Sequence, residues 1–294
     1  MDDRSLTVKS FDNGIRPTWC PGCGDFAILT ALKNAFVAEN IHPHEVMIVS
    51  GIGCGSKLPD YIRAYGFMTI HGRPLPVATG IHLANHAMHV VVVDGDGDAY
   101  GIGGNHLLHT LRRNPNITHI VENNQIYALT KGQYSPTSHK GFKTTTSPEG
   151  AIETPVLPTA LAFTGGATFI ARGFSGEPKH LAKLIAAGLR HRGYALIDVL
   201  QPCVTFNKLN TYEWYQERIY KVDEQEGYSP EDRRQAAEVV NQWGDRIPIG
   251  ILYQEKGRPT YVDEVTSLAE GPLTARPLTK LPESLFEQLK ESFV

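Results

Sequence analysis

Short apolar segments, each followed by a glycine-rich loop and then by a segment of helical periodicity, recur along this chain. Two of them read "EVMIVSGIGC" and "HVVVVDGDGDAYGIGGN". Continuous apolar runs of this length are typical of strands buried on both faces, and strands that alternate with helices pair in parallel. The pattern therefore predicts an α/β fold in which helices cover both faces of a mostly parallel sheet.

The helical segments follow the same logic. Phe26, Leu29, Leu32 and Phe36 recur at helical spacing after "CPGCG", which predicts an amphipathic helix there. Ser229 is the expected N-cap of a later helix. The other expected helices read "GNHLLHTLRRNPN", "PVLPTALAFTGG", "PKHLAKLIAAGLRHRG" and "SPEDRRQAAEVVNQWG", and the other expected strands read "ITHIVENN", "ATFIARG", "YALIDVLQPC" and "IPIGILYQE".

The regular alternation weakens after Thr205, so we expect a main domain over 1–204 and a C-terminal extension over 205–294. Prolines in "EGPLTARPLTKLPESL" predict an extended arm before a short terminal helix. This extension has two interpretations. It is either a subdomain that packs on the main domain or an arm that grips another chain.

Composition excludes several classes of function. The net charge is −3 and the sequence contains no basic block, which argues against nucleic acid as a partner. The longest apolar stretch, "HVVVVD", is too short to cross a membrane, and the polar start "MDDRSLTVKSFDNG" does not resemble a signal peptide. We therefore expect a cytoplasmic protein, in which grouped cysteines more often bind metal or carry redox chemistry than form disulfides.

The four cysteines all stand in turn-like settings, and only one pair is close in sequence. Cys20 and Cys23 belong to "WCPGCG", whereas Cys54 and Cys203 are isolated. Four thiolates suit either Zn²⁺ or an iron–sulfur cluster. Structural zinc sites usually combine two local pairs, so the scattered spacing favours a cluster, with unrelated buried thiols as a further interpretation.

The loop "DGDGDAYGIGGN" is the most informative stretch. It does not fit the dinucleotide-binding G-x-G-x-x-G pattern, because Tyr100 occupies the sixth position counted from Gly95. The Asp96 carboxylate, the Asn124 amide oxygen and a nearby carbonyl would instead suit Mg²⁺ bound to a diphosphate. Glycines at 95 and 97 would let the backbone approach that ligand closely. A tight turn with solvated acids is the alternative interpretation.

These features share one position in the predicted fold. Cys54, the "DGDGD" loop, the "ENN" segment and Cys203 each follow the carboxyl end of a predicted strand. Ligands of open α/β sheets bind at that edge. We therefore expect the cysteines and the aspartate–asparagine pair to come together there.

The "GDG" and "NN" elements together resemble the thiamine diphosphate binding motif. Asp96 and Asn124 are 28 residues apart, which is the spacing of that motif. The resemblance implies that Asp96 and Asn124 bind Mg²⁺ through side chains and that Ile126 binds it through its carbonyl. It also implies that Gly97 and Asp98 face the diphosphate, and Gly95 is expected to contact the cofactor as well.

Over about residues 11–220 the chain resembles the β subunits of 2-oxoacid:ferredoxin oxidoreductases. The resemblance is carried by "WCPGCG", "GIGCGSKLPDY", "HGRPLPVATG", "GDGDAYGIGGNHLLHTLRRN", "NNQIYALTKGQYSPTS" and "QPCVTFN". It implies a [4Fe–4S] cluster on Cys20, Cys23, Cys54 and Cys203. The last two motifs look most like the enzymes that act on 2-oxoglutarate.

This family resemblance implies an activity. The cofactor would serve as an electron sink while CO₂ leaves the 2-oxoacid, the cluster would pass electrons to ferredoxin, and coenzyme A would take the acyl group as succinyl-CoA. An α subunit would supply the activating glutamate, within an (αβ)₂ heterotetramer. The alternatives are a β subunit that acts on pyruvate, indolepyruvate or a broad range of 2-oxoacids and, more distantly, a non-catalytic zinc module.

For several candidate site residues the sequence gives weaker support. His71 could line the thiazolium or substrate pocket, or it could be a hydrogen-bonded structural histidine. Thr130 and Lys131 could meet the substrate carboxylate or the diphosphate, or they could be solvated loop residues. Ile52 and Gly53, in the loop that carries Cys54, are expected to contact the cofactor.

Overall fold

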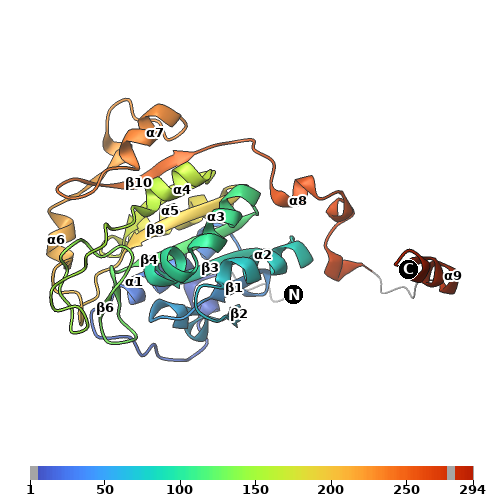
Figure 1. Cartoon of the computed structure of the whole chain (residues 1–294), viewed down its shortest axis with the longest axis horizontal. Coiled ribbons are helices and arrows are strands. Elements are labelled where there is room, and N and C mark those ends of the chain that lie inside the picture. Colours follow the sequence, from blue (N-terminus) through green and yellow to red (C-terminus); the bar gives the residue numbers. More distant parts are fainter. Residues whose placement is uncertain (1–5, 277–281, 294) are drawn as a thin grey trace.

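An eight-stranded sheet forms the centre of the protein, as the computed structural model shows for residues 6–276 and 282–293 (Figure 1). Its order is β2-β1-β3-β4-β8-β7-β10-β9. The strands are β1 (Val46–Ser50), β2 (Tyr65–Met68), β3 (His89–Gly95), β4 (Ile117–Asn123), β7 (Phe169–Phe174), β8 (Tyr194–Leu200), β9 (Ile219–Lys221) and β10 (Ile247–Gln254). A separate two-stranded hairpin joins β5 (Ile126–Tyr127) to β6 (Gln133–Tyr134).

All sheet pairings are parallel except that of β10 with β7, which is antiparallel. The predicted mostly parallel α/β sheet is thus confirmed. The sequence also predicted a strand at 247–255, but its direction was not part of that prediction. Through β10 and β9, residues of the C-terminal extension continue the same sheet.

Helices cover both faces of the sheet, as predicted. One apolar core packs α1 (Asp25–Ala38) and α5 (Pro178–Arg190) against the first face. The other core packs α2 (Pro74–Ala84), α3 (Gly104–Arg113), α4 (Pro158–Gly165) and α7 (Arg233–Val239) against the second. The valines of β3 alternate between the two cores, because successive side chains of a strand point to opposite faces. The other α-helices of the described residues are α6 (Tyr212–Gln216), α8 (Tyr261–Glu264) and α9 (Glu283–Glu291).

One predicted helix cap was wrong. The helix α7 begins at Arg233, and its N-cap is Asp232 rather than Ser229. The Asp232 carboxylate accepts hydrogen bonds from the backbone N–H groups of Arg234 and Gln235, as an N-cap side chain should. Ser229 lies before this turn, where its own N–H donates to the Gln235 side chain.

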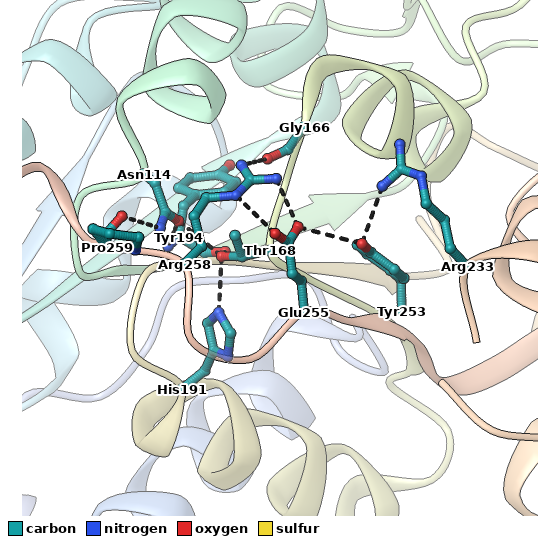
Figure 2. A network of polar contacts seen from close by, with 10 residues as sticks. All are labelled: Asn114, Gly166, Thr168, His191, Tyr194, Arg233, Tyr253, Glu255, Arg258 and Pro259. Carbon is teal, nitrogen blue, oxygen red and sulfur yellow. Dashed lines mark hydrogen bonds and ion pairs between the residues drawn. The ribbon is translucent and has the colours of Figure 1, made fainter. Parts of the chain in front are cut away.

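The segment after β10 is tied to the sheet by a polar network (Figure 2). Arg258 donates to the Gly166 carbonyl at 2.7 Å and to both carboxylate oxygens of Glu255. The Asn114 amide donates to the Pro259 carbonyl and accepts from Thr168 and from the N–H of Tyr194. These contacts fix the chain at the end of the sheet where β7 and β8 begin.

A fully buried ion pair joins β7 to β8. Arg172 Nε lies 3.2 Å from Asp198 Oδ2, and neither side chain is exposed to solvent. Tyr100 and Asn123 also donate to Asp198, and Arg172 Nη2 donates to Thr159. A buried ion pair of this kind is costly to break, because its removal leaves one charge without compensation.

We therefore expect Arg172→Met to lower the free energy of unfolding by about 3 to 5 kcal/mol, measured by urea denaturation of the purified protein. The exposed pair of Lys256 and Glu231 provides the matched control. Lys256→Met should cost less than about 1 kcal/mol. If the two variants lose equal free energy of unfolding, the buried Arg172–Asp198 pair is no more important to stability than an exposed pair.

Candidate functional site

The carboxyl ends of four adjacent strands lie side by side at one edge of the sheet. In register, Ser50 of β1 pairs with Val93 of β3, Gly95 of β3 with Glu122 of β4, and Asn123 of β4 with Leu200 of β8. The loops that follow these strands carry Cys54, the "GDG" segment, Asn124 and Cys203. Most of the predicted site residues therefore come from neighbouring loops.

The four cysteines line a single cavity of about 210 Å³. Residues 20 and 23 belong to the loop before α1, so the cavity collects thiols from three separate parts of the chain. All four are free of disulfides. Asn124 and Lys131 line the same cavity. No three His, Cys, Asp or Glu side chains in residues 6–276 and 282–293 are grouped closely enough to hold one metal ion. The four thiols therefore line a cavity, and they do not converge closely enough to bind a single metal ion.

Two of the four thiols, those of Cys23 and Cys54, are disfavoured as bare thiolates. Burial, with the charges of Asp25 and Cys203 adding to it, raises the pKa of Cys54 to about 11, while Lys57 opposes the shift. Burial and Asp25 also raise the pKa of Cys23. A thiolate needs a nearby cation in such a site, and bound iron would supply that charge. The donor set thus fits a metal cluster.

Other residues around the cavity were not predicted from the sequence. Trp19 Nε1 donates to the Cys54 carbonyl at 2.7 Å, and Gln201 Nε2 donates to Cys23 Sγ at 3.2 Å. Burial raises the pKa of Asp25 to about 6, and burial with the Asp25 charge raises that of Glu122, so ionisation of both acids at once is disfavoured. Trp19 and Gln201 are part of the motifs "WCPGCG" and "QPC", so their sequence position could have indicated that they lie beside the cysteines. No sequence pattern connects Asp25 with Glu122.

The side chain of Asp96 is almost fully buried, with 1% of its surface exposed. Burial raises its pKa to about 6, and hydrogen bonds from Ser135 and Thr137 oppose this shift. Both hydroxyls donate to the same carboxylate oxygen, Oδ2, at 2.5 Å. Among the described residues no side chain donates to Oδ1. That oxygen is therefore the one suited to a metal ion.

The two other expected magnesium ligands lie one strand away. Asn124 Oδ1 accepts from the N–H of Ile126 at 3.1 Å, which leaves the oxygen a second lone pair. A carboxylate, an amide oxygen and the Ile126 carbonyl together form an all-oxygen set, as Mg²⁺ requires. The donor set fits that ion, although its binding stays a prediction.

The loop residues around Asp96 are closely packed. A Cβ on Gly97 would lie 2.0 Å from Cε1 of Tyr127, so only glycine fits there. The Asp98 carboxylate accepts from the backbone N–H groups of Ile52, at 2.8 Å, and Gly72. Burial raises the Asp98 pKa to about 7. Asp98 thus holds neighbouring loops together. Its contact with a diphosphate stays a prediction, and so does the contact of Gly95, Gly97 and Gly53 with the cofactor.

The predicted catalytic residues differ in how far they approach the site. His71 Nδ1 lies 3.0 Å from Asp98 Oδ1, and burial lowers the His71 pKa. Lys131 lines the cysteine cavity and also a second cavity of about 270 Å³ that contains Lys143 and Phe142. Thr130 donates to the Gln133 side chain on an exposed turn. Of the three, Lys131 is the residue that the structure brings next to the cysteines.

Comparison with known proteins agrees with this geometry. Residues 51–199 match the family described as thiamine pyrophosphate enzyme, C-terminal TPP binding domain. Residues 203–270 match the family that describes the C-terminal part of the pyruvate ferredoxin oxidoreductase beta subunit. The fold and the first match define a thiamine diphosphate enzyme domain.

Similar proteins indicate which family of thiamine diphosphate enzymes this chain belongs to. The β subunit of 2-oxoacid:ferredoxin oxidoreductase 2 from Aeropyrum pernix is 43% identical over 271 residues, which cover 89% of this chain and 88% of that one. The 2-oxoglutarate synthase subunit KorB of Methanocaldococcus jannaschii is 36% identical over 86% of this chain and 92% of its own length. This chain belongs to the family of 2-oxoacid:ferredoxin oxidoreductase β subunits.

A solved structure supports the same placement. The 2-oxoglutarate:ferredoxin oxidoreductase from Magnetococcus marinus, described with 2-oxoglutarate, coenzyme A and succinyl-CoA bound, has a TM-score of 0.89 and 35% identity. The match covers 98% of this chain and 97% of that one. In the described residues of this chain, no helix has the length and apolar character needed to cross a membrane.

If the four cysteines share one cluster, any one of them is essential to it. We expect Cys203→Ala to lose the iron and the visible absorption of the purified protein, although Cys203 is distant from Cys20 in sequence. The neighbouring change Val204→Ala keeps all four thiols and should retain both signals. Full iron content in the Cys203 variant would contradict a shared site, and a colourless wild-type protein that contains zinc would indicate the zinc module instead.

Proposed function

We propose that this chain, together with an α subunit, oxidises 2-oxoglutarate with coenzyme A to succinyl-CoA and CO₂. The bond between C1 and C2 of 2-oxoglutarate breaks to release CO₂, and a thioester bond forms to the coenzyme A sulfur with loss of the thiol proton. Two electrons leave the substrate and reduce two ferredoxins in single-electron steps. The reaction can run toward carboxylation when reduced ferredoxin is abundant.

The observation that carries this proposal is the cavity shared by the four cysteines and Asn124. It favours a [4Fe–4S] cluster directly beside the expected magnesium ligands. A cluster in that position could accept electrons one at a time from a substrate held at the neighbouring loop. Structural zinc sites are closed around a single ion, and they leave no such cavity between their ligands.

Asp96, Asn124 and Ile126 are the residues that would hold Mg²⁺, and through it the diphosphate. Bound thiamine diphosphate would supply the electron sink for loss of CO₂. The chain itself positions Asp96 and Asn124 directly after two adjacent strands, with Ile126 at the start of β5, and buries the Asp96 side chain. Lys131, in the shared cavity wall, is a cation that could meet a substrate carboxylate, and His71 and Thr130 remain candidates in the same role.

The proposed substrate and co-substrate rest on relatives. The Magnetococcus marinus structure and the KorB relatives are described with 2-oxoglutarate in their names, and coenzyme A is bound in that structure. Other relatives at 43–45% identity are named for 2-oxoacids in general. A wider substrate range that includes pyruvate is therefore the second candidate.

An exposed apolar surface favours partner subunits. The edge strand β2 exposes the large apolar side chains of Tyr65, Phe67 and Met68, and Ile70, two residues after the strand, is exposed as well. Exposed apolar patches of this kind mark interaction surfaces. We propose that the α subunit, which would supply the activating glutamate, and a second αβ pair cover such surfaces in an (αβ)₂ heterotetramer. A cytoplasmic location also belongs to this proposal.

The test is a panel of 2-oxoacids assayed by dye reduction with coenzyme A, with the chain alone and with its α subunit. We expect no substantial turnover by the chain alone, and a preference of the assembled enzyme for 2-oxoglutarate over pyruvate. Turnover without a second polypeptide would overturn the division of the site between subunits. Equal kcat/KM values for the two acids would favour the broad-range enzyme.

A further inference from the structure

The sequence "SPTS" at residues 135–138 is part of a recognised motif but has no part in the function described above. It follows directly on the β5–β6 hairpin, which starts at Ile126. In the hairpin Ile126 pairs with Tyr134 in antiparallel register. The turn is closed by a bond from the Gly132 N–H to the Tyr127 carbonyl. The hairpin therefore returns the chain to the expected magnesium ligands.

Three hydroxyls of this segment, which we call the hydroxyl clamp, are those of Ser135, Thr137 and Ser138. Each residue has only 3% of its surface exposed. The Ser138 hydroxyl accepts from the Ser135 N–H, at 2.8 Å, and the Ser138 N–H donates to the Ser135 carbonyl. These bonds close the segment into a compact turn, so its hydroxyls have fixed positions.

The clamp contacts both halves of the expected metal site. On the β3 side, Ser135 and Thr137 each donate to Oδ2 of Asp96 at 2.5 Å. On the β4 side, Ser138 donates to the carbonyl of Gln125 at 2.6 Å. Gln125 stands between Asn124 and Ile126 and has a φ of 58°, a conformation that needs external support in a residue other than glycine.

Thr137 also lies against the neighbouring strand β4. Its hydroxyl oxygen is 3.0 Å from Asn123 Oδ1, so the single hydroxyl proton faces two acceptors, that oxygen and Asp96 Oδ2. The amide of Asn123 donates to the buried Asp198. Thr137 is therefore held between Asp96 and the buried polar centre of the sheet.

We propose that the hydroxyl clamp positions the magnesium ligands: it fixes Asp96 with Oδ1 turned to the metal and fixes the backbone that presents Asn124 and Ile126. Ser135 and Thr137 are positioning residues that act through Asp96, and Ser138 acts through Gln125. Mg²⁺ demands nearly ideal octahedral geometry, whereas Ca²⁺ accepts flexible coordination. A clamp of this kind therefore contributes to the choice of metal as well as to affinity. The inference rests on the proposed magnesium and thiamine diphosphate site.

The experiment titrates Mg²⁺ and, separately, Ca²⁺ into the assembled complex with its α subunit, after removal of metal and in the presence of saturating thiamine diphosphate. Calorimetry gives the Kd of each metal. Thr137→Val keeps the shape of the side chain but loses the hydroxyl, and we expect it to raise the Kd for Mg²⁺ about 10- to 100-fold. The Kd for Ca²⁺ should rise less, because its coordination tolerates a turned carboxylate.

Three further variants make the result specific. Thr137→Ser retains a hydroxyl and should restore the Mg²⁺ affinity, while Ser135→Ala removes the other donor to Asp96 and should weaken it. Thr79→Val is the matched control, since the buried Thr79 hydroxyl donates only within α2, to the Leu75 carbonyl. It should leave both metal affinities unchanged. Iron content should be equal in all variants, which shows that the fold and the cysteine site are intact.

The outcomes separate the clamp from the function on which it rests. If the wild-type complex with saturating thiamine diphosphate binds no Mg²⁺, the proposed metal site is wrong and the clamp is overturned with it. If the wild type binds Mg²⁺ while Thr137→Val and Ser135→Ala both match the Thr79→Val control, the metal site stands and the clamp alone is overturned.

Discussion

The parallel register of β1, β3, β4 and β8 is the constraint on which the rest of the site depends. Because these strands run in the same direction and lie next to one another, the loops after them meet at one edge. Cys54, Asp96, Asn124 and Cys203 are far apart in sequence, and only this register brings their loops together. A shift of β4 against β3 by one residue would turn Asn123 and Glu122 to the opposite faces.

Buried polar contacts hold this register below the site. The His119 ring on β4 lies 2.8 Å from Asp94 of β3 and 2.6 Å from the Tyr194 hydroxyl of β8. At the same level as Asp94, Asp198 of β8 accepts from Asn123 of β4 and forms the ion pair with Arg172 of β7. Such groups are satisfied only when the strands are aligned, so they specify one arrangement of the sheet. Apolar packing alone would be less selective.

Much of the fold and the main site residues could be predicted from the sequence, because their signals are local. The strand before "GIGC", the helix after "CPGCG" and the "GDG" loop each show their character within a dozen residues. The antiparallel direction of β10 could not be read in this way, since "IPIGILYQE" suits either direction. The Ser229 cap was wrong because several capping residues precede α7, and only backbone geometry decides among them. The contacts of Ser135 and Thr137 with Asp96 join residues about forty positions apart, and a local sequence pattern cannot predict contacts over that distance.

In the proposed function, one edge of the sheet places an electron-accepting cluster beside a thiamine diphosphate site. The most direct test is anaerobic stopped-flow absorption of the assembled enzyme after mixing with 2-oxoglutarate and coenzyme A. We expect the visible cluster absorption to bleach in the wild type. In Asp96→Ala it should persist with substrate, although the variant retains its iron and a chemical reductant still bleaches it. Bleaching of the Asp96→Ala cluster by substrate at the wild-type rate would contradict this placement of the cofactor.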